Sequence, residues 1–522
     1  MRWNQAGKAV GLMLIVLSML LSACGSNQGA ANGTKAETET KTEAKGMVIT
    51  LKGDPVGFDP QNTTDTISSL INYQIYDRLV TFNENMEIVP QLAKSWTTSE
   101  DGKTWAFELN KGITFTDGTP FNAEAVKTSF ERVADEGKNL SQHSLVGSFI
   151  DNITTNGETE VVFHLKAPQG AFLGNLASVS SSILSPKSIK ENEEGIAKSP
   201  VGTGPFKLKK FTTGDAVVLE ANKDYWGGAP KLSTVTFKNV PETASRVIML
   251  ENGESDLMEG VPITEIERLK QNSELVINPI KANRIAYIGF NTTVKPFDQP
   301  AVRQALNYAI DKETLVNKLY DGRVTVATSA IASRTIGYSN VGSYPFDMDK
   351  AKQMLKDAGV VPGNYTFRLI LAANVVQDKP AAEFVQNSLQ QLGFNIELQT
   401  LELGTYLETL KDPGKYDLFV RGALATTGDA DPLFRDALLS TSATNYAHYN
   451  NPEVDKLILA GQAQFDPKQR LESYAKVLEL VKTDAPWIFL HEDMARYGMS
   501  KKVEGITFLP TYVYDLRKAV KN

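Results

Sequence analysis

The sequence predicts an α/β fold that extends over more than one domain. In the second half of the chain, segments with helical and strand periodicity alternate, and one strand–helix–strand run has only short connections. Such a run forms a βαβ unit, whose two strands lie parallel in one sheet. The chain has 522 residues, more than a single hydrophobic core usually holds, so we expect two or three domains.

Patterns typical of strands and helices are also present in the first half of the chain. Apolar residues at helical spacing over 67–76 predict a helix, and Asp101-Gly102 predicts a hairpin turn. Asn122 is expected to cap the start of a further helix. The predicted strands are 47–51, 95–97, 104–109 and 113–115.

In the second half, Pro300 begins a helix, and a second helix over 351–358 is expected to end at Gly359. The βαβ unit follows. Its predicted elements are a strand over 367–371, a helix through 384–392 that ends at Gly393, and a strand over 394–398.

The N-terminal segment predicts export and lipid attachment. Arg2 and Lys8 precede an apolar run that is shorter than the ~20 residues of a membrane-spanning helix. Ser22 and Ala23 then lead into Cys24, the only cysteine. This pattern resembles the lipobox of bacterial lipoproteins, which implies that 1–23 is a signal peptide and that the Cys24 thiol is acylated. An ordinary secretory signal with an incidental cysteine is the alternative.

The composition of the chain excludes several classes of function. Residues 24–46, which precede the globular part of the chain, carry no large apolar side chain. We therefore expect this segment to be a flexible tether. The formal net charge of −7 lacks the basic excess that nucleic-acid binding requires. Once Cys24 is acylated no thiol remains for disulfides, thiolate metal sites or nucleophilic catalysis.

Phrases along the chain resemble, in order, the large extracytoplasmic solute-binding proteins of ABC importers, in particular the oligopeptide, dipeptide and nickel-binding family (family 5). The first half contains Tyr-Asp-Arg-Leu, Glu-Asp-Gly-Lys-Thr-Trp and Val-Gly-Thr-Gly-Pro-Phe. The second half contains Arg-Gln-Ala-Leu-Asn-Tyr-Ala-Ile-Asp and Asn-Pro-Glu-Val-Asp. The phrases fall at 76–79, 100–105, 201–206, 303–311 and 451–455.

The resemblance implies a bilobed fold of the periplasmic-binding-protein kind (class II), with the ligand between the lobes. Lobe 1 would be 47–285, with an inserted subdomain at about 77–199, completed by 490–522, and lobe 2 would be 286–489. It also implies a monomer at the extracytoplasmic face of the cell membrane, held by its lipid anchor. The partners would be ABC permease subunits with their ATPase.

The ligand-reading loop of this family follows the strand that begins here at Tyr416-Asp417-Leu418. Thr427-Gly428-Asp429 matches a motif that in dipeptide-type members supplies a carboxylate to the ligand's α-ammonium. The chemistry fits, because a buried ammonium needs a carboxylate partner. The alternative is that Asp429 caps a local turn, although we expect Asp431 to be the turn residue.

The same loop departs from the dipeptide pattern. Dipeptide-type members carry a tryptophan before the motif, where this chain has Ala423-Leu424-Ala425, and the loop is more similar to glutathione-type binding proteins. Arg421 could pair with a ligand carboxylate through its bidentate fork, or form an ion pair within the scaffold. Tyr446 could line the cleft or simply pack.

Nickel, or a metal held by a small chelator, is the alternative ligand. The segment around His143 resembles nickel-type members, although a solvated surface position is the simpler interpretation of this residue. The four histidines are scattered, so no metal-ligand cluster is visible, and we predict no metal site and no cofactor.

No motif points to catalysis. Gly-x-Ser-x-Gly and His-Glu-x-x-His are absent, and no spacing singles out a catalytic carboxylate pair. We therefore expect a binding protein and not an enzyme. A surface lipoprotein that senses its ligand without feeding a permease is a remote alternative.

Overall fold

A computed structural model describes residues 45–373 and 378–522. The predicted signal peptide, Cys24 and nearly all of the predicted tether lie outside the described residues. Helices and strands alternate in a mixed α/β architecture, which confirms the predicted fold class. Within the described residues, no helix is long and apolar enough to cross a membrane.

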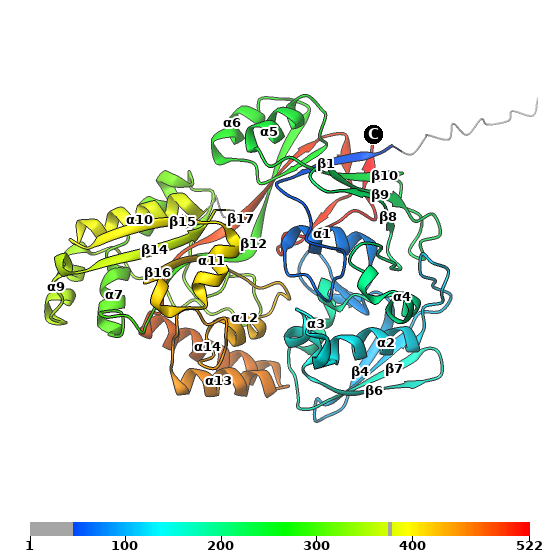
Figure 1. Cartoon of the computed structure of the whole chain (residues 1–522), viewed down its shortest axis with the longest axis horizontal. Coiled ribbons are helices and arrows are strands. Elements are labelled where there is room, and N and C mark those ends of the chain that lie inside the picture. The colour runs from blue at the N-terminus through cyan, green and yellow to red at the C-terminus, as the bar shows by residue number, and fades with distance from the viewer. Residues whose placement is uncertain (1–44, 374–377) are drawn as a thin grey trace, which may run out of the picture. The chain divides into compact units, whose positions relative to one another are not determined.

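The largest sheet has eleven strands, and ten of them follow the order β15-β14-β16-β12-β17-β11-β1-β10-β9-β8, while β13 pairs with β17 (Figure 1). Their bounds are β1 Met47–Leu51, β8 Phe206–Thr212, β9 Ala216–Ala221, β10 Thr234–Asn239, β11 Leu257–Glu259, β12 Leu275–Phe290, β13 Thr325–Val326, β14 Thr366–Ala372, β15 Asn395–Leu401, β16 Leu418–Leu424 and β17 Trp487–Ser500.

Two long antiparallel strands, β12 and β17, connect two separate groups of core residues (Figure 1). The first core gathers buried side chains from 47–257 and 495–519. The second core gathers those from 285–490, in two clusters that lie on opposite faces of the sheet. Because β12 and β17 contribute to both cores, they are the covalent and hydrogen-bonded link between the two halves.

The first core includes a second sheet, of order β4-β5-β7-β6. The strands are β4 Ala93–Thr98, β5 Thr104–Leu109, β6 Ile150–Asn156 and β7 Glu160–Leu165. Helix α2 (Ala123–Ala134) packs on this sheet, with the ring of Phe130 edge-on to Phe163 at 4.9 Å. The predicted hairpin and the predicted cap are both confirmed, since β4 pairs with β5 and the Asn122 side chain accepts from the Ala125 amide.

The strand predicted over 113–115 was wrong. The chain turns back at once, because the Phe115 amide donates to the Thr119 carbonyl and Gly118 takes a positive φ of 83°. Only an isolated bridge joins Thr114 to Pro120. An apolar run this short, followed directly by Asp-Gly, forms a tight turn before any ladder can grow.

In the second core, the predicted βαβ unit is confirmed. Strands β14 and β15 are parallel in register from Thr366↔Asn395 to Ala372↔Leu401, with α10 (Lys379–Gln391) between them. Helices α7 (Pro300–Tyr308) and α9 (Met348–Asp357) also form where predicted, and Gly359 has a φ of +70° after α9.

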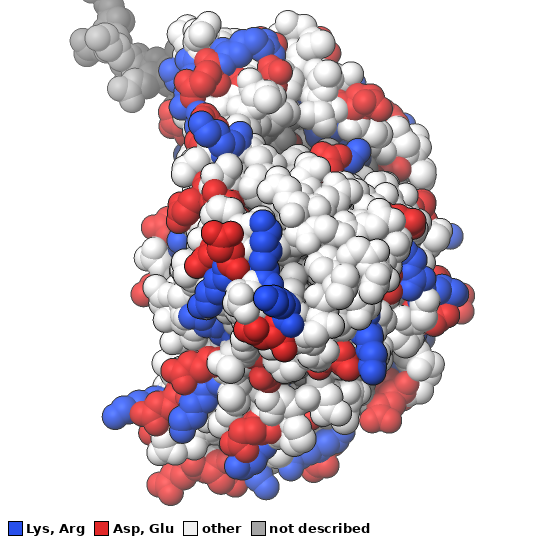
Figure 2. Space-filling view, turned by 90° about the vertical axis from the view of Figure 1, so that its left-hand side faces the viewer, with Lys and Arg blue, Asp and Glu red and all other residues white. Residues whose placement is uncertain are grey.

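Further helices are α1 Thr66–Ile75, which forms where the sequence predicts it, α3 Phe172–Ala177, α11 Leu403–Leu410, α12 Ala430–Ala437, α13 Pro452–Ala463 and α14 Pro467–Asp484. Helices α12, α13 and α14 lie on the side of the second core that comes near α2 and α3 (Figure 1). On the face drawn in Figure 2, acidic and basic side chains are interspersed, without a field of one sign.

Candidate functional site

The loop between β16 and α12 lies against segments of the first core. A methyl group at Gly428 would lie 2.7 Å from the Cε of Met86, which follows strand β2 (Val80–Phe82). A methyl group at Gly174 of α3 would lie 3.6 Å from the Thr427 carbonyl. Gly428 also has a φ of +72°, a backbone state that favours glycine. The predicted ligand-reading loop is therefore at the junction of the two cores.

Asp429 is the N-cap of α12. Its Oδ1 accepts from the Asp431 amide at 2.8 Å, and its two oxygens accept from Nη1 and Nη2 of Arg470 at 2.7 and 2.6 Å. Asp429 is 4 % exposed, so this is a buried bidentate ion pair. A carboxylate offers about four lone-pair positions, and three of them are occupied within the protein.

Asp431, which we expected to be the turn residue, lies instead in the first turn of α12. It is fully buried and contacts Arg435 Nε at 3.0 Å and the Tyr474 hydroxyl at 2.9 Å. Burial raises the pKa of Asp431, and the charges of Arg435 and Arg470 oppose that shift. Asp429 thus caps the helix, as the alternative weighed from the sequence has it, because α12 begins one residue after Asp429 and the cap position falls on the earlier aspartate.

Thr427 and Gly428 are held by a second loop of the same core. Thr427 is 1 % exposed, and its Oγ1 accepts from the Asp429 amide at 3.4 Å. The Ile336 amide donates to the Gly428 carbonyl at 2.8 Å, and the Ala430 amide donates to the Ile336 carbonyl at 2.9 Å. Main-chain bonds on both sides thus fix the loop.

Arg421 lies in β16, opposite Tyr287 of β12. Its guanidinium carbon is 4.8 Å above the ring of Tyr446. Burial lowers the pKa of Arg421, but the phenol groups of Tyr287, Tyr406 and Tyr446 outweigh it and the net shift is upward. No carboxylate among residues 45–373 and 378–522 forms a salt bridge with it, so the scaffold ion pair weighed from the sequence is not found there.

His143 opens a single helical turn after α2. Its Nδ1 is 2.8 Å from the Val133 carbonyl oxygen, and its Nε2 is 3.9 Å from a carboxylate oxygen of Glu136. These partners all belong to the α2 region. In the described part of the chain, no group of three or more His, Cys, Asp and Glu residues is placed to hold a metal ion.

Sequence reasoning missed the contacts that α13 and α14 make with the first core. Phe465, between these helices, is edge-on to Trp105 at 5.9 Å, and a methyl group at Gly102 would lie 3.1 Å from its ring. The Gly170 amide donates to the Gln462 carbonyl at 3.0 Å. No local pattern marks these residues, because each contact joins segments about 290 to 360 residues apart.

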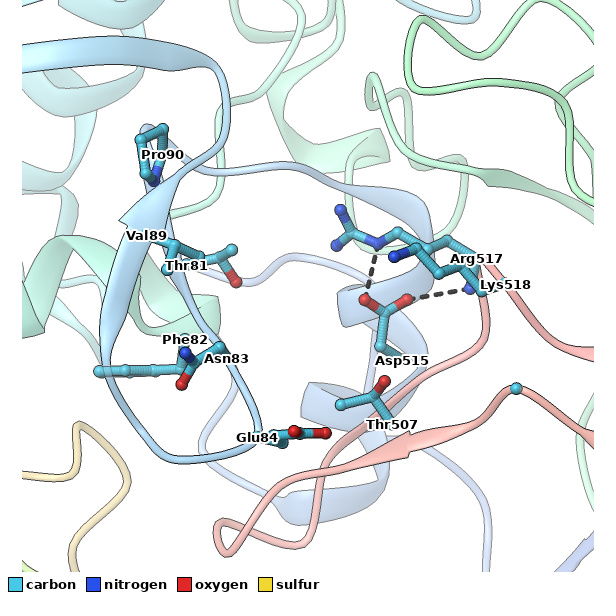
Figure 3. Close-up of a pocket in the computed structure, with 11 residues that line it drawn as sticks. Thr81, Phe82, Asn83, Glu84, Val89, Pro90, Thr507, Asp515, Arg517 and Lys518 are labelled. Carbon is cyan, nitrogen blue, oxygen red and sulfur yellow. Dashed lines mark hydrogen bonds and ion pairs between the residues drawn. The ribbon is translucent and has the colours of Figure 1, made fainter.

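A cavity of about 320 Å³ lies beside the hairpin of β2 and β3 (Ile88–Pro90) (Figure 3). Its other wall is the C-terminal segment 505–518, where Asp515 and Arg517 form an ion pair with 2.6 Å between Oδ2 and Nε. Phe82 lines this cavity and also lies 3.9 Å from the methyl position at Gly428. Phe82 therefore lies between the cavity and the loop that carries Thr427, Gly428 and Asp429, and none of these three residues lines the cavity itself.

Comparison with known proteins decides the family. The model of the bacterial extracellular solute-binding proteins, family 5 (middle region), matches residues 87–445. The chain belongs to this family. The predicted resemblance is thereby confirmed, and the family is one of solute-binding proteins and not of enzymes.

Individual members of family 5 are similar over nearly the whole chain. The glutathione-binding protein GsiB of Pectobacterium atrosepticum is 31% identical over 486 residues, which cover 91% of this chain and 94% of the relative. The periplasmic binding protein DppA of Helicobacter pylori, solved with the peptide STSA, has a TM-score of 0.81 at 28% identity and covers 91% of this chain and 98% of its own. AppA of Bacillus subtilis, solved with a nonapeptide, has the same TM-score and identity, with coverage of 91% and 99%.

Proposed function

We propose that this family 5 protein captures a small peptide, such as a dipeptide, an oligopeptide or a glutathione-like compound, and delivers it to an ABC permease driven by its ATPase. The observation that carries the proposal is similarity over nearly the whole chain to a glutathione-binding protein and to two structures that hold peptides. The loop that carries Thr427-Gly428-Asp429 lies where two cores meet, as a ligand-enclosing site requires.

The two cores act in this proposal as the lobes of a clamp. Lobe 1 would comprise 47–285 with its subdomain at about 77–199 and its completion by 490–522, and lobe 2 would comprise 286–489. The separation of the core residues into two groups linked by β12 and β17 supports this division. A ligand shifts such a clamp toward closure only by contacting the closed form better than the open one.

Asp429 would meet the ligand amine through the lone-pair position that remains free. Arg470 and the Asp431 amide occupy the other positions, so an ammonium at this place would complete the carboxylate's set of partners. Thr427 and Gly428 would contact the ligand through the loop backbone, and Tyr446 through its ring.

Isothermal titration calorimetry on the mature chain tests the proposal. The panel contains Ala-Ala, tri- and tetra-alanine, reduced and oxidised glutathione, and nickel with histidine. Binding of any of the peptides or of glutathione at micromolar affinity or tighter is the expected result. Binding of none of them would overturn the proposal. Tight binding of nickel–histidine alone, lost in His143→Gln, would establish the metal-chelate alternative instead.

The amine contact has its own test. Ala-Ala-Ala and N-acetyl-Ala-Ala-Ala are titrated into the wild type and into Asp429→Asn. The wild type should prefer the free amine, and Asp429→Asn should abolish that preference by weakening only the free-amine peptide. An unchanged preference in the variant would remove Asp429 from the site.

We further propose that Cys24 carries the lipid that holds the protein at the extracytoplasmic face of the cell membrane. The apolar run and the small residues before Cys24 support this. Labelled palmitate fed to the host should appear in the wild-type protein but not in Cys24→Ala, which should be released from the membrane fraction. Equal retention of both proteins in that fraction would contradict the proposal.

A further inference from the structure

Arg421 is one of several arginines that form no salt bridge within the described residues; Arg78, which is fully buried over the ring of Tyr73 and donates to the Thr81 hydroxyl, is another. Arg246, Arg303 and Arg496 also form no salt bridge there, but each guanidinium donates to main-chain carbonyls at 2.5–2.9 Å. Arg421 is half-buried, and its guanidinium contacts the Tyr446 side chain without a carboxylate or a carbonyl as partner among the described residues. Its directional donors are therefore available for a group from outside the chain.

Three tyrosines surround this guanidinium, and each is fixed in place. Tyr287 stacks on Trp487 at 4.1 Å, and the Tyr406 hydroxyl donates to the Val420 carbonyl at 2.6 Å. Tyr446 is held through its carbonyl, which accepts from the Tyr416 hydroxyl at 2.6 Å. These contacts preorganise the walls, so little entropy is lost when a ligand enters.

The chemistry of such walls favours one kind of ligand group. A guanidinium is a planar fork that matches the two oxygens of a carboxylate. Aromatic neighbours exclude water and so strengthen the charge-assisted hydrogen bonds that form beside them. The charge of Arg421 acts to lower the pKa of Asp436, but the two side chains form no ion pair. The guanidinium donors of Arg421 therefore stay free to bind a ligand carboxylate.

Arg421 also lies close in the chain to the loop at the junction of the cores. Side chains in a strand alternate between the faces, so Arg421 and Ala423 share one face of β16. Ala423 lies between Arg421 and the loop that starts at Ala425, and its side chain is only a methyl group. Ala423 packs in the same cluster as Ala430 and Leu433, so Arg421 lies on the face of β16 that also faces α12, the helix that Asp429 caps.

We propose that Arg421, with Tyr287, Tyr406 and Tyr446, forms a subsite that binds a carboxylate of the ligand, so that the protein prefers peptides carrying a carboxylate at one defined position over their amide counterparts. This inference rests on the proposed capture of a peptide. The carboxylate can belong to the C-terminus or to an acidic side chain, and the two sources are separated by experiment.

The experiment compares three peptides by calorimetry: Ala-Glu-Ala, Ala-Gln-Ala and the C-terminal amide of Ala-Gln-Ala. In the wild type, one of the two carboxylate-to-amide changes should weaken binding about tenfold or more, the ratio expected for one charge-assisted pair. In Arg421→Gln that ratio should fall to about one, and Arg421→Lys, which keeps the charge but not the fork, should retain part of it.

Arg368→Gln is the matched control. Arg368 lies on the neighbouring strand β14 and already pairs with Asp417 at 2.9 Å, so its loss should leave the carboxylate preference unchanged. If Arg421→Gln fails to fold, the affinities for the three peptides are compared in Arg421→Lys and in Tyr446→Phe, which removes only a hydroxyl.

Two outcomes would overturn the subsite. One is equal affinity of the wild type for all three peptides, and the other is a preference that survives in Arg421→Gln. A wild type that binds no peptide at all would overturn the proposed function itself, and this result is distinct from binding without a preference.

Discussion

Arg470 on α14 donates two hydrogen bonds to Asp429 at the start of α12, at 2.7 and 2.6 Å, across 41 positions in the chain. This pair ties the loop at the junction of the cores to the helix behind it. Breaking one side of a buried ion pair leaves an uncompensated charge, which costs more than the pair contributes.

Arg470→Met should therefore lower the free energy of unfolding by about 3–5 kcal/mol. The double variant Asp429→Asn with Arg470→Met should recover much of that loss, because neither side then leaves a buried charge. Urea denaturation of both variants measures this. As a control, Lys411→Met breaks the exposed Lys411–Glu408 pair and should cost less than about 1 kcal/mol. A cost that small for Arg470→Met would show that the buried pair is not structurally important.

Gly428 combines a positive φ with a crowded environment. Gly428→Ala should lower the free energy of unfolding by about 1–2 kcal/mol through backbone strain alone, and further through the contact with Met86. Gly118→Ala is the matched control, since Gly118 has a φ of +83° with no atom within 4 Å of the methyl position. Thermal unfolding of both variants, and of Gly428→Ala with Met86→Ala, separates strain from crowding. Equal losses in Gly118→Ala and Gly428→Ala would mean that Met86 yields without cost.

Phe465 joins the second core to Trp105 of the first without belonging to the proposed ligand contacts. Phe465→Ala should therefore weaken ligand binding, because it removes a contact that exists only when the cores are together. An aromatic pair contributes about 0.5–1.5 kcal/mol beyond its burial, so the expected loss of affinity is roughly two- to tenfold. Phe346→Ala, at a phenylalanine that is 51 % exposed, should leave affinity unchanged. Identical affinities in calorimetry for wild type and Phe465→Ala would show that this contact does not bias closure.

Lys312 is 3 % exposed, and burial, aided by the charge of Lys482, lowers its pKa to about 7. The unfolded chain holds this proton up to a pH near the ordinary value of about 10.4. Between these values the unfolded state binds more protons than the folded state, so this lysine makes stability rise with pH from about 7 upward.

Lys312→Met should accordingly raise stability at pH 6, where the buried charge is most costly, and should have less effect at pH 9. Denaturant unfolding at the two pH values measures the difference between variant and wild type. Lys350→Met, at an exposed lysine of α9, is the control and should show the same small effect at both. A stabilisation by Lys312→Met that is no larger at pH 6 than at pH 9 would contradict the linkage.

Local patterns were sufficient for most elements. Two examples are the cap at Asn122 and the parallel pairing of β14 with β15. Both follow from residue patterns that are close together in the chain, and tertiary packing reinforces them. The strand predicted over 113–115 does not form, and the cause is again local: the Asp-Gly turn follows directly, so the segment is too short to pair with another strand.

The site was harder to predict. The motif Thr427-Gly428-Asp429 was visible as a phrase, and a capping role for Asp429 was weighed as the alternative, but Asp431 was wrongly expected to be the turn residue because the first residue of α12 could not be located to within one position. Arg470 and Phe465 could not be found at all. Each acts through a partner far away in the chain, and nothing in the neighbouring residues records such a contact.

The amino-acid sequence by itself determined the α/β class, the family, and the phrase that marks the ligand loop, since these depend on periodicity, turn chemistry and residue order. Only the tertiary structure decided which charges are paired and which remain open. Asp429 is already engaged by Arg470, whereas Arg421 has three tyrosines around it and no acidic partner among the residues that the structure describes. The reason is physical: whether a buried charge has a partner depends on distances between segments that the fold alone brings together.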